Sequence, residues 1–241
     1  MYCPNRWILL DRLSVLDKWA VGKTRTSLAT ARAVSRVLEE PSTKWVAGPN
    51  YDLDPGDFTV SGLYDPAADE HVRIMHYLGL LEEKVYIECS VSIGGGVTTW
   101  SDISWLKFKR TAVDVVCHEQ LHSYRHRSRN FAIPKSYEAT SSANELEKEK
   151  IYLKDPDEIE CYAHNIASEL LDFYGHIRFA RKYDWTYLIQ MPPPDCPSIH
   201  LWAYGRAHGR NKKLMASLMS QTYKFMDEIH NQYQNYLIGN D

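Results

Sequence analysis

The sequence predicts a fold of the α+β class, in which a small mixed or antiparallel sheet packs against helices. Residues typical of strands, rich in Val, Ile, Tyr and Thr, occur in the middle of the chain. Apolar residues at helical spacing occur before and after that middle part. A block of strands set between helices is typical of the α+β class.

Composition and charge narrow the range of partners. The chain has 241 residues, of which 44% are hydrophobic, and its net charge is −3. A chain of this length can bury one large core without disulfides, and its charge provides no overall field for nucleic acid or an anionic membrane. Residues 7–10 are too short an apolar run for a signal peptide, and no stretch is long enough for a membrane helix. We therefore expect a cytoplasmic protein without a nucleic-acid or membrane partner.

The first half of the chain predicts helices followed by strands. Helical spacing runs over 11–40, as one helix or as two broken near Gly22, and a loop follows at 49–56. Strands are expected at 58–64 and 72–77, joined by a turn at Asp65-Pro66, and at 85–93, before the three glycines of residues 94–96. The five cysteines are scattered and none is in a Cys-x-x-Cys spacing, so we expect them to be reduced and mostly buried.

The second half predicts three helices. They are expected over 111–127, from Pro156 to Tyr174, where Asp155 is suited to cap the first turn, and from Lys212 to about Tyr236. A polar surface connection is expected over 136–150, and Pro192-Pro193-Pro194 breaks the chain. No convincing linker is visible. We therefore expect one domain over 1–241, with a core at 49–178 and helical extensions at 1–48 and 179–241.

The chemistry of the chain is concentrated in His118-Glu119-Gln120-Leu121-His122, inside the helix predicted over 111–127. At 3.6 residues per turn the two histidines lie on the same face, where two imidazoles can bind one ion. Glu119 is rotated by about 100° from His118 and can reach a water beside the ion as a general base. Zinc suits this arrangement because it accepts imidazole nitrogen and carboxylate oxygen. The alternative is two histidines on a half-exposed helix face with a solvated Glu119.

The motif helix, followed by a second helix with acidic and small residues, resembles the gluzincin branch of the zincin metallopeptidases. Glu160-Cys161-Tyr162-Ala163-His164 is similar to the Glu-x-x-Ala pattern of small gluzincins, and the stretch from Asp155 to Ala163 resembles short HExxH proteins encoded by tailed phages. The resemblance covers roughly residues 58–174. It implies a zincin-like fold, a zinc ion and a glutamate as the third metal ligand.

Two glutamates compete for the role of third ligand. Glu160 lies nearer the edge of the buried stripe of its helix than Glu158 does, and residues two apart on a helix point away from each other. Glu158 also has another explanation, since it occupies the capping-box position relative to Asp155. We therefore favour Glu160 over Glu158. A set of His118, His122 and His126 is excluded because eight helical residues separate its outer members by about 12 Å.

Other roles follow from position alone. His164 or Tyr162 can supply a donor to the developing oxyanion, although an exposed histidine and a helix-packing tyrosine explain the two residues equally well. Residues 97–100 are the nearest candidate for an edge strand that pairs with an extended substrate. Asp114, one turn before His118, can accept a hydrogen bond from a metal ligand. An ordinary charged residue on the exposed face of the helix would give the same pattern.

These features lead to one main hypothesis and two alternatives. The main hypothesis is a zinc metallopeptidase with His118, His122 and Glu160 as ligands, Glu119 as general base and a protein or peptide as substrate. The first alternative is a phage-encoded structural or interaction protein, in the host cytoplasm or the virion, whose metal is vestigial or stabilising and whose partners include phage structural proteins. The second alternative is a protein without metal.

Overall fold

The computed structural model describes residues 3–38, 42–48, 52–79, 84–132, 145–175, 185–191 and 195–239. As predicted, the fold is mixed α+β: helices dominate, with one sheet of two strands and one of three. Contacts divide the chain into two compact units, Pro4–Phe131 on one side and Met1–Cys3 with Ala132–Asp241 on the other. The first unit holds the sheets and the HExxH helix, and the described elements of the second are helical.

The N-terminal part of the first unit is mostly helical, and of the two alternatives for residues 11–40 the structure has the one that is broken near Gly22. Its helices are α1 (Arg6–Ser14), α2 (Asp17–Ala20) and α3 (Ser27–Leu38), with the short strand β1 (Thr24–Thr26) before α3. Gly22 has a φ of +70°, a left-handed conformation that glycine adopts at little cost, and it ends the first helical stretch.

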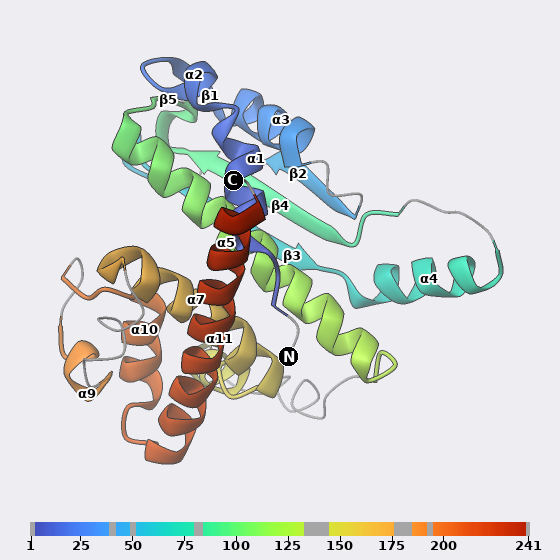
Figure 1. The fold of residues 1–241 in the computed structure, drawn as a ribbon, viewed down its shortest axis with the longest axis vertical. Helices are drawn as coiled ribbons and strands as arrows, with labels where there is room; N and C mark the ends of the chain where they lie inside the picture. Colours follow the sequence, from blue (N-terminus) through green and yellow to red (C-terminus); the bar gives the residue numbers. More distant parts are fainter. Residues whose placement is uncertain are drawn as a thin grey trace. The chain divides into compact units, whose positions relative to one another are not determined.

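A three-stranded sheet forms the centre of this unit. Its strands are β2 (Thr43–Ala47), β4 (Ile87–Ile93) and β3 (Phe58–Tyr64), in that order across the sheet, and β4 runs between the other two (Figure 1). β2 is parallel to β4 and β3 is antiparallel to it. The strands expected at 58–64 and 85–93 are therefore confirmed, whereas β2 was not predicted.

The strand predicted over 72–77 is wrong: these residues belong to helix α4 (Pro66–Tyr77). The Asp65 side chain accepts hydrogen bonds from the backbone N–H groups of Ala67 and Ala68, and Pro66 occupies the first turn. Asp65-Pro66 is thus the start of a helix and not a hairpin turn, since an aspartate N-cap followed by proline is typical of a helix N-terminus. The strand β3 therefore pairs with β4 instead of with its successor in the chain.

A second, smaller sheet pairs two short strands of the first unit. After a tight 3-10 turn at Gly94–Gly96, strand β5 (Val97–Thr99) pairs antiparallel with β1. The segment at 97–100, expected to be an edge strand near the site, therefore has one of its edges occupied by β1.

Helix α5 (Asp102–Ser128) carries the HExxH motif and begins nine residues earlier than predicted. A reciprocal capping box between Ser101 and Ser104 fixes its start. Its first turns are anchored by stacked and edge-to-face aromatic rings, among them Trp105 on Phe108 with centroids 5.1 Å apart and Trp100 against Phe108 at the same distance. The helix packs along β3, which brings the motif against the sheet (Figure 1).

The second unit is a helical cluster. Its described helices are α6 (Glu145–Tyr152), α7 (Pro156–Tyr174), α9 (Trp185–Leu188), α10 (Ile199–His208) and α11 (Lys212–Gly239), and α11 and α10 pack on α7. The predicted helices at 156–174 and from 212 are confirmed, with Asp155 as N-cap and Gly175 left-handed at the C-terminus of α7. Of the polar connection expected over 136–150, residues 136–144 lie outside the described residues and the rest belong to α6. Pro192-Pro193-Pro194 also lies outside the described residues.

Candidate metal centre

His118 and His122 are brought together on α5, as the four-residue spacing predicts. Both side chains are buried, and their Nε2 atoms lie 3.2 Å apart. Two nitrogens bound to one tetrahedral zinc at about 2.0–2.1 Å would be separated by about 3.3 Å. The pair therefore already has the spacing of two ligands of a single ion.

Glu119 lies beside the pair and faces strand β3. A Cβ added to Gly62 of β3 would lie 2.6 Å from both the Cγ and an Oε of Glu119, so the absence of a side chain at Gly62 makes room for this carboxylate. Glu119 is itself buried. The thiol of Cys89, opposite Gly62 on β4, has a raised pKa because it is buried and because the negative charge of Glu119 is near. These contacts hold Glu119 against the sheet, next to the two imidazoles.

Tyr64, the last residue of β3, packs on the imidazole of His122. The two rings are nearly parallel, with an interplanar angle of 10° and centroids 6.3 Å apart, and the same tyrosine ring contacts His126 at 5.2 Å. Burial raises the pKa of the Tyr64 phenol above its usual value, and the hydrogen bond to Asp69 raises it further. The phenol therefore stays protonated and serves as a donor.

Asp69 of α4 receives that hydrogen bond and joins three elements beside His122. Its carboxylate is fully buried. Three side chains donate to it: Tyr64 Oη at 2.8 Å, Ser123 Oγ at 2.7 Å and Arg127, whose Nη2 and Nε lie 2.6 Å and 2.9 Å from Oδ1. The ion pair and the two hydroxyl donors offset the cost of burying this carboxylate. Asp69 therefore fixes β3 to α5 within one turn of His122.

Neither Tyr64 nor Asp69 was among the site residues predicted from the sequence. The strand predicted over 72–77 left no place for the helix that carries Asp69. The Asp65-Pro66 pair, as a helix start, was the pattern that would have placed Asp69 in the first turns of a helix.

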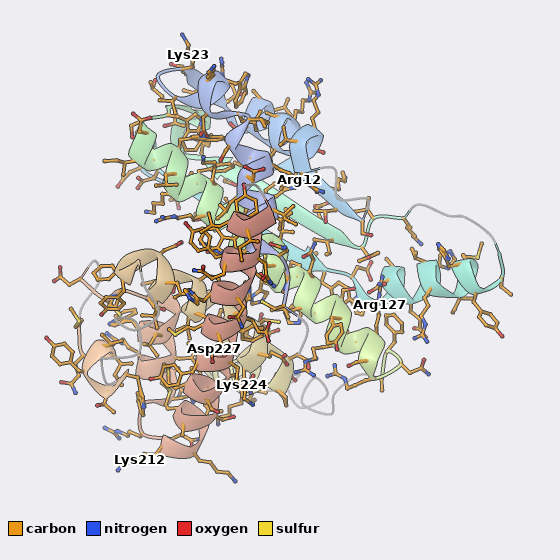
Figure 2. The ribbon with its side chains drawn as sticks, in the orientation of Figure 1. Arg12, Lys23, Arg127, Lys212, Lys224 and Asp227 are labelled. Carbon is orange, nitrogen blue, oxygen red and sulfur yellow. The ribbon has the colours of Figure 1, made fainter. Side chains whose placement is uncertain are left out.

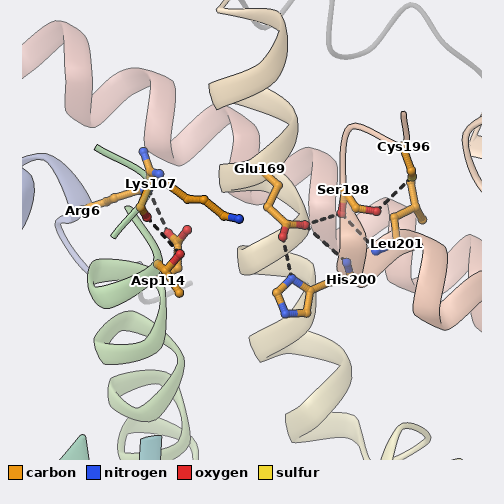
Figure 3. A network of polar contacts seen from close by, with 9 residues as sticks. Arg6, Lys107, Asp114, Glu169, Cys196, Ser198, His200 and Leu201 are labelled. Carbon is orange, nitrogen blue, oxygen red and sulfur yellow. Dashed lines mark hydrogen bonds and ion pairs between the residues drawn. The ribbon is translucent and has the colours of Figure 1, made fainter. Parts of the chain in front are cut away.

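His126 and Asp114 are the two remaining residues of α5 that the sequence analysis considered. His126 is buried against Tyr64, one turn beyond His122. The carboxylate of Asp114 forms an ion pair with the buried guanidinium of Arg6, with Nε and Oδ1 3.0 Å apart (Figure 3). Asp114 therefore links α5 to the N-terminal helix α1.

The other candidates lie on α7, in the second unit. Glu158, Glu160 and His164 are all buried there, on a helix that is covered nearly all round. The phenol of Tyr152 forms a hydrogen bond with Glu158; its pKa is raised by burial and then by the charge of Glu158. The imidazole of His164 packs edge-on against Phe225 of α11, with centroids 5.3 Å apart.

Cys161 adds a ligand type that the sequence analysis had assigned to packing alone. It is a reduced, buried cysteine directly after Glu160. Cys161, His118 and His122 are all buried, and cysteine and histidine are the residue types that bind zinc most often. The signal that could have identified Cys161 is its position directly after Glu160, in the segment that resembles gluzincins.

A second polar cluster, in the second unit, contains a serine, a histidine and a glutamate. These residues are not arranged as the catalytic triad of a serine hydrolase. Glu169 accepts hydrogen bonds from Ser198 Oγ and from Nδ1 of His200, the latter at 2.9 Å (Figure 3). Serine and histidine thus both bind the carboxylate, whereas a nucleophilic serine must donate to the histidine. Ser198 Oγ also accepts from the backbone N–H of Leu201 and caps α10. The cluster fixes the start of α10 against α7.

No protein-family model, curated protein or solved structure matches this chain. Among the helices in the described ranges, none has the length and apolar character required to cross a membrane.

Proposed function

We propose that the protein is a zinc-dependent peptidase whose metal is held by His118 and His122. The observation that carries this proposal is the 3.2 Å separation of the two buried Nε2 atoms, with the Glu119 carboxylate on the same helix. The pair fits zinc because both ligand atoms are imidazole nitrogens at the spacing of a tetrahedral site. The resemblance to gluzincins supports peptides as the substrate class.

A third ligand completes such a site, and α7 offers two adjacent candidates. Glu160 is the ligand that the resemblance implies, and Cys161 is a buried thiol of a type that zinc also accepts. We propose Glu160, with Cys161 as the alternative and Glu158 as a partner of Tyr152. Cobalt substitution separates the two ligands, because a thiolate ligand gives an intense near-ultraviolet charge-transfer band and a carboxylate gives none. If Glu160 is the ligand, the wild type shows no such band and the Glu160→Gln variant loses its metal. A band that disappears in Cys161→Ser would assign the thiolate instead.

Glu119 would perform the proton transfers. Zinc, when bound, polarises a carbonyl and lowers the pKa of water to about 7. The Glu119 carboxylate accepts a proton from the water that attacks the peptide carbon, and it returns that proton to the departing amine nitrogen as the C–N bond breaks. The carboxylate is regenerated in its ionised form, and the net reaction is the hydrolysis of one peptide bond.

The Glu119→Gln substitution tests this function. It removes the base but retains the size of the side chain, so we expect zinc to stay bound and cleavage of an unstructured protein such as casein to be lost. Glu88→Gln is the matched control, because Glu88 is exposed on β4 and pairs with Lys44 at the surface. Full proteolysis by Glu119→Gln would reject the mechanism.

A second candidate function is a structural zinc site in a scaffold protein. The burial of both histidines favours it, because structural zinc ions are closed off from solvent. A chelator melt of the wild type separates the two functions. A structural site predicts a fall in Tm on chelation in a protein without any peptidase activity, whereas the peptidase predicts loss of cleavage when the zinc is removed.

A further inference from the structure

A hollow in the first unit lies between α4 and the C-terminal end of α5. Its volume is about 620 Å³, and six residues line it: Val72, Arg73, His76, Tyr124, Arg127 and Ser128. Two of these are arginines, one is a histidine and two carry hydroxyl groups. The lining contains no carboxylate among the described residues. The hollow therefore presents positive charge and hydrogen-bond donors.

Arg127 is oriented in this hollow by groups beneath it. Its Nε and Nη2 donate to Asp69, Nη2 also donates to the Tyr86 hydroxyl at 2.9 Å, and the guanidinium lies 5.2 Å from the Tyr86 ring centre. Nη1 forms no hydrogen bond within the described part of the chain, and the side chain is 44% exposed. Figure 2 labels Arg127 where α5 approaches α4. The fork is thus fixed on one edge and retains free donors on another.

Arg73 enters the hollow from α4. Its Nη1 donates to Asn130 Oδ1 at 3.1 Å, and its guanidinium lies 5.8 Å from the centre of the Phe131 ring. Asn130 and Phe131 form the turn after α5, both with a positive φ. The Nε and Nη2 groups of Arg73 form no hydrogen bond among the described residues. A second guanidinium is therefore held at the hollow with donors to spare.

The hollow is distinct from the proposed metal centre. Arg127 follows His122 by five residues, which places it about 140° further around the helix. The imidazole of His122 faces Tyr64 on β3, whereas the hollow is bounded by α4. A ligand in the hollow would not need the metal.

We propose that this hollow binds an oxyanion, the phosphate or carboxylate group of a small ligand. Two arginines with unused N–H donors match the oxygen atoms of such groups. Arg73 retains its Nε and Nη2 groups, an edge that can donate two parallel hydrogen bonds, and Arg127 retains the donors of Nη1. The imidazole of His76 extends the donor set.

Titration calorimetry with inorganic phosphate and with acetate, on chelated protein, tests the proposal and removes any contribution from bound zinc. Arg73→Gln is the diagnostic variant, since Arg73 is exposed and its loss leaves no buried charge behind. Arg36→Gln on α3 is the matched control, because it makes the same charge change at another exposed position of the same unit. His76→Gln provides a second variant within the hollow.

We expect saturable binding of at least one anion by the wild type and by Arg36→Gln. Affinity should be about tenfold lower in Arg73→Gln, because a charge-assisted pair is lost, and lower also in His76→Gln. Binding of phosphate alone assigns a phosphate ligand, and binding of acetate assigns a carboxylate. The absence of saturable binding by the wild type would overturn the proposal. Equal affinity in Arg73→Gln and Arg36→Gln would overturn it as well, and neither result would bear on the zinc site.

Discussion

The Tyr64 ring lies within 10° of parallel to the imidazole of His122, while its hydroxyl donates to the buried carboxylate of Asp69 at 2.8 Å. One face of a proposed zinc ligand is therefore covered by a side chain that is itself fixed at the far end. Groups behind a metal ligand restrict its orientation, and their loss typically lowers metal affinity about 10- to 100-fold.

Replacement of Tyr64 should therefore weaken metal binding. We expect Tyr64→Leu to lower zinc affinity about tenfold, because the His122 ring loses its support, and Tyr64→Phe to lower it less, because the ring remains. Competition with a zinc chelator measures both. Tyr77→Leu is the control, since Tyr77 is 91% exposed. Unchanged affinity in Tyr64→Leu would show that the ring does not position His122.

Asp69 should be important for stability as well. In Asp69→Asn the neutral amide cannot balance Arg127, and its NH2 group faces the hydroxyl donors of Tyr64 and Ser123. We expect a loss of about 2–3 kcal/mol in the free energy of unfolding, less than the roughly 3–5 kcal/mol lost when a fully buried pair is broken, because Arg127 is partly exposed. Urea denaturation measures it, with the exposed neighbour Glu70→Gln as control. Equal stability of the two variants would contradict this role.

Gly62 controls the space around the proposed base. In Gly62→Ala the new Cβ would overlap Glu119, which lies 2.6 Å from that position, so the carboxylate must move. Since a displacement of about 1 Å can cost about a hundredfold in rate, we expect peptide hydrolysis to fall about 10- to 100-fold with zinc still bound. Leu63→Ala is the control, because Leu63 is exposed on the opposite face of β3. A fully active Gly62→Ala protein would argue against Glu119 as the base.

The long helices and the histidine pair could be predicted from the sequence because their causes are local. The start and end of α7 agree with the prediction because its cap, first-turn proline and terminal glycine lie beside it in the chain. The approach of His118 and His122 follows from helix geometry alone.

Helix α4 was missed because its apolar residues do not form a buried stripe. Ile74 is 52% exposed and Tyr77 is 91% exposed, so the apolar residues of α4 do not mark a buried helix face in the sequence. The site's supports were missed for another reason: Ser123 lies 54 residues from Asp69 in the chain, and no local pattern indicates such a contact. Likewise, β2 is a five-residue strand whose identity depends on its pairing with β4.

Protonation of His208 should lower the stability of the protein in mild acid. Burial lowers its pKa, and the positive charge of Lys154 lowers it further. Because the unfolded chain binds a proton near pH 6.5 and the folded chain only at lower pH, the contribution of His208 to stability is complete above pH 6.5 and decreases as the pH falls through its folded pKa. Urea midpoints across this range should fall more steeply for the wild type than for His208→Gln. The exposed His71→Gln should behave as the wild type, and identical slopes for all three would contradict the assignment.

Elemental analysis of the purified wild type beside His122→Ala tests the central claim most directly, with circular dichroism to establish that both are folded. If the two imidazoles hold one ion, the wild type carries one zinc per chain and the folded His122→Ala protein carries almost none, since a zinc site depends on each of its few ligands. A wild type without stoichiometric zinc after growth in zinc-supplemented medium, or equal zinc in both proteins, would contradict the account.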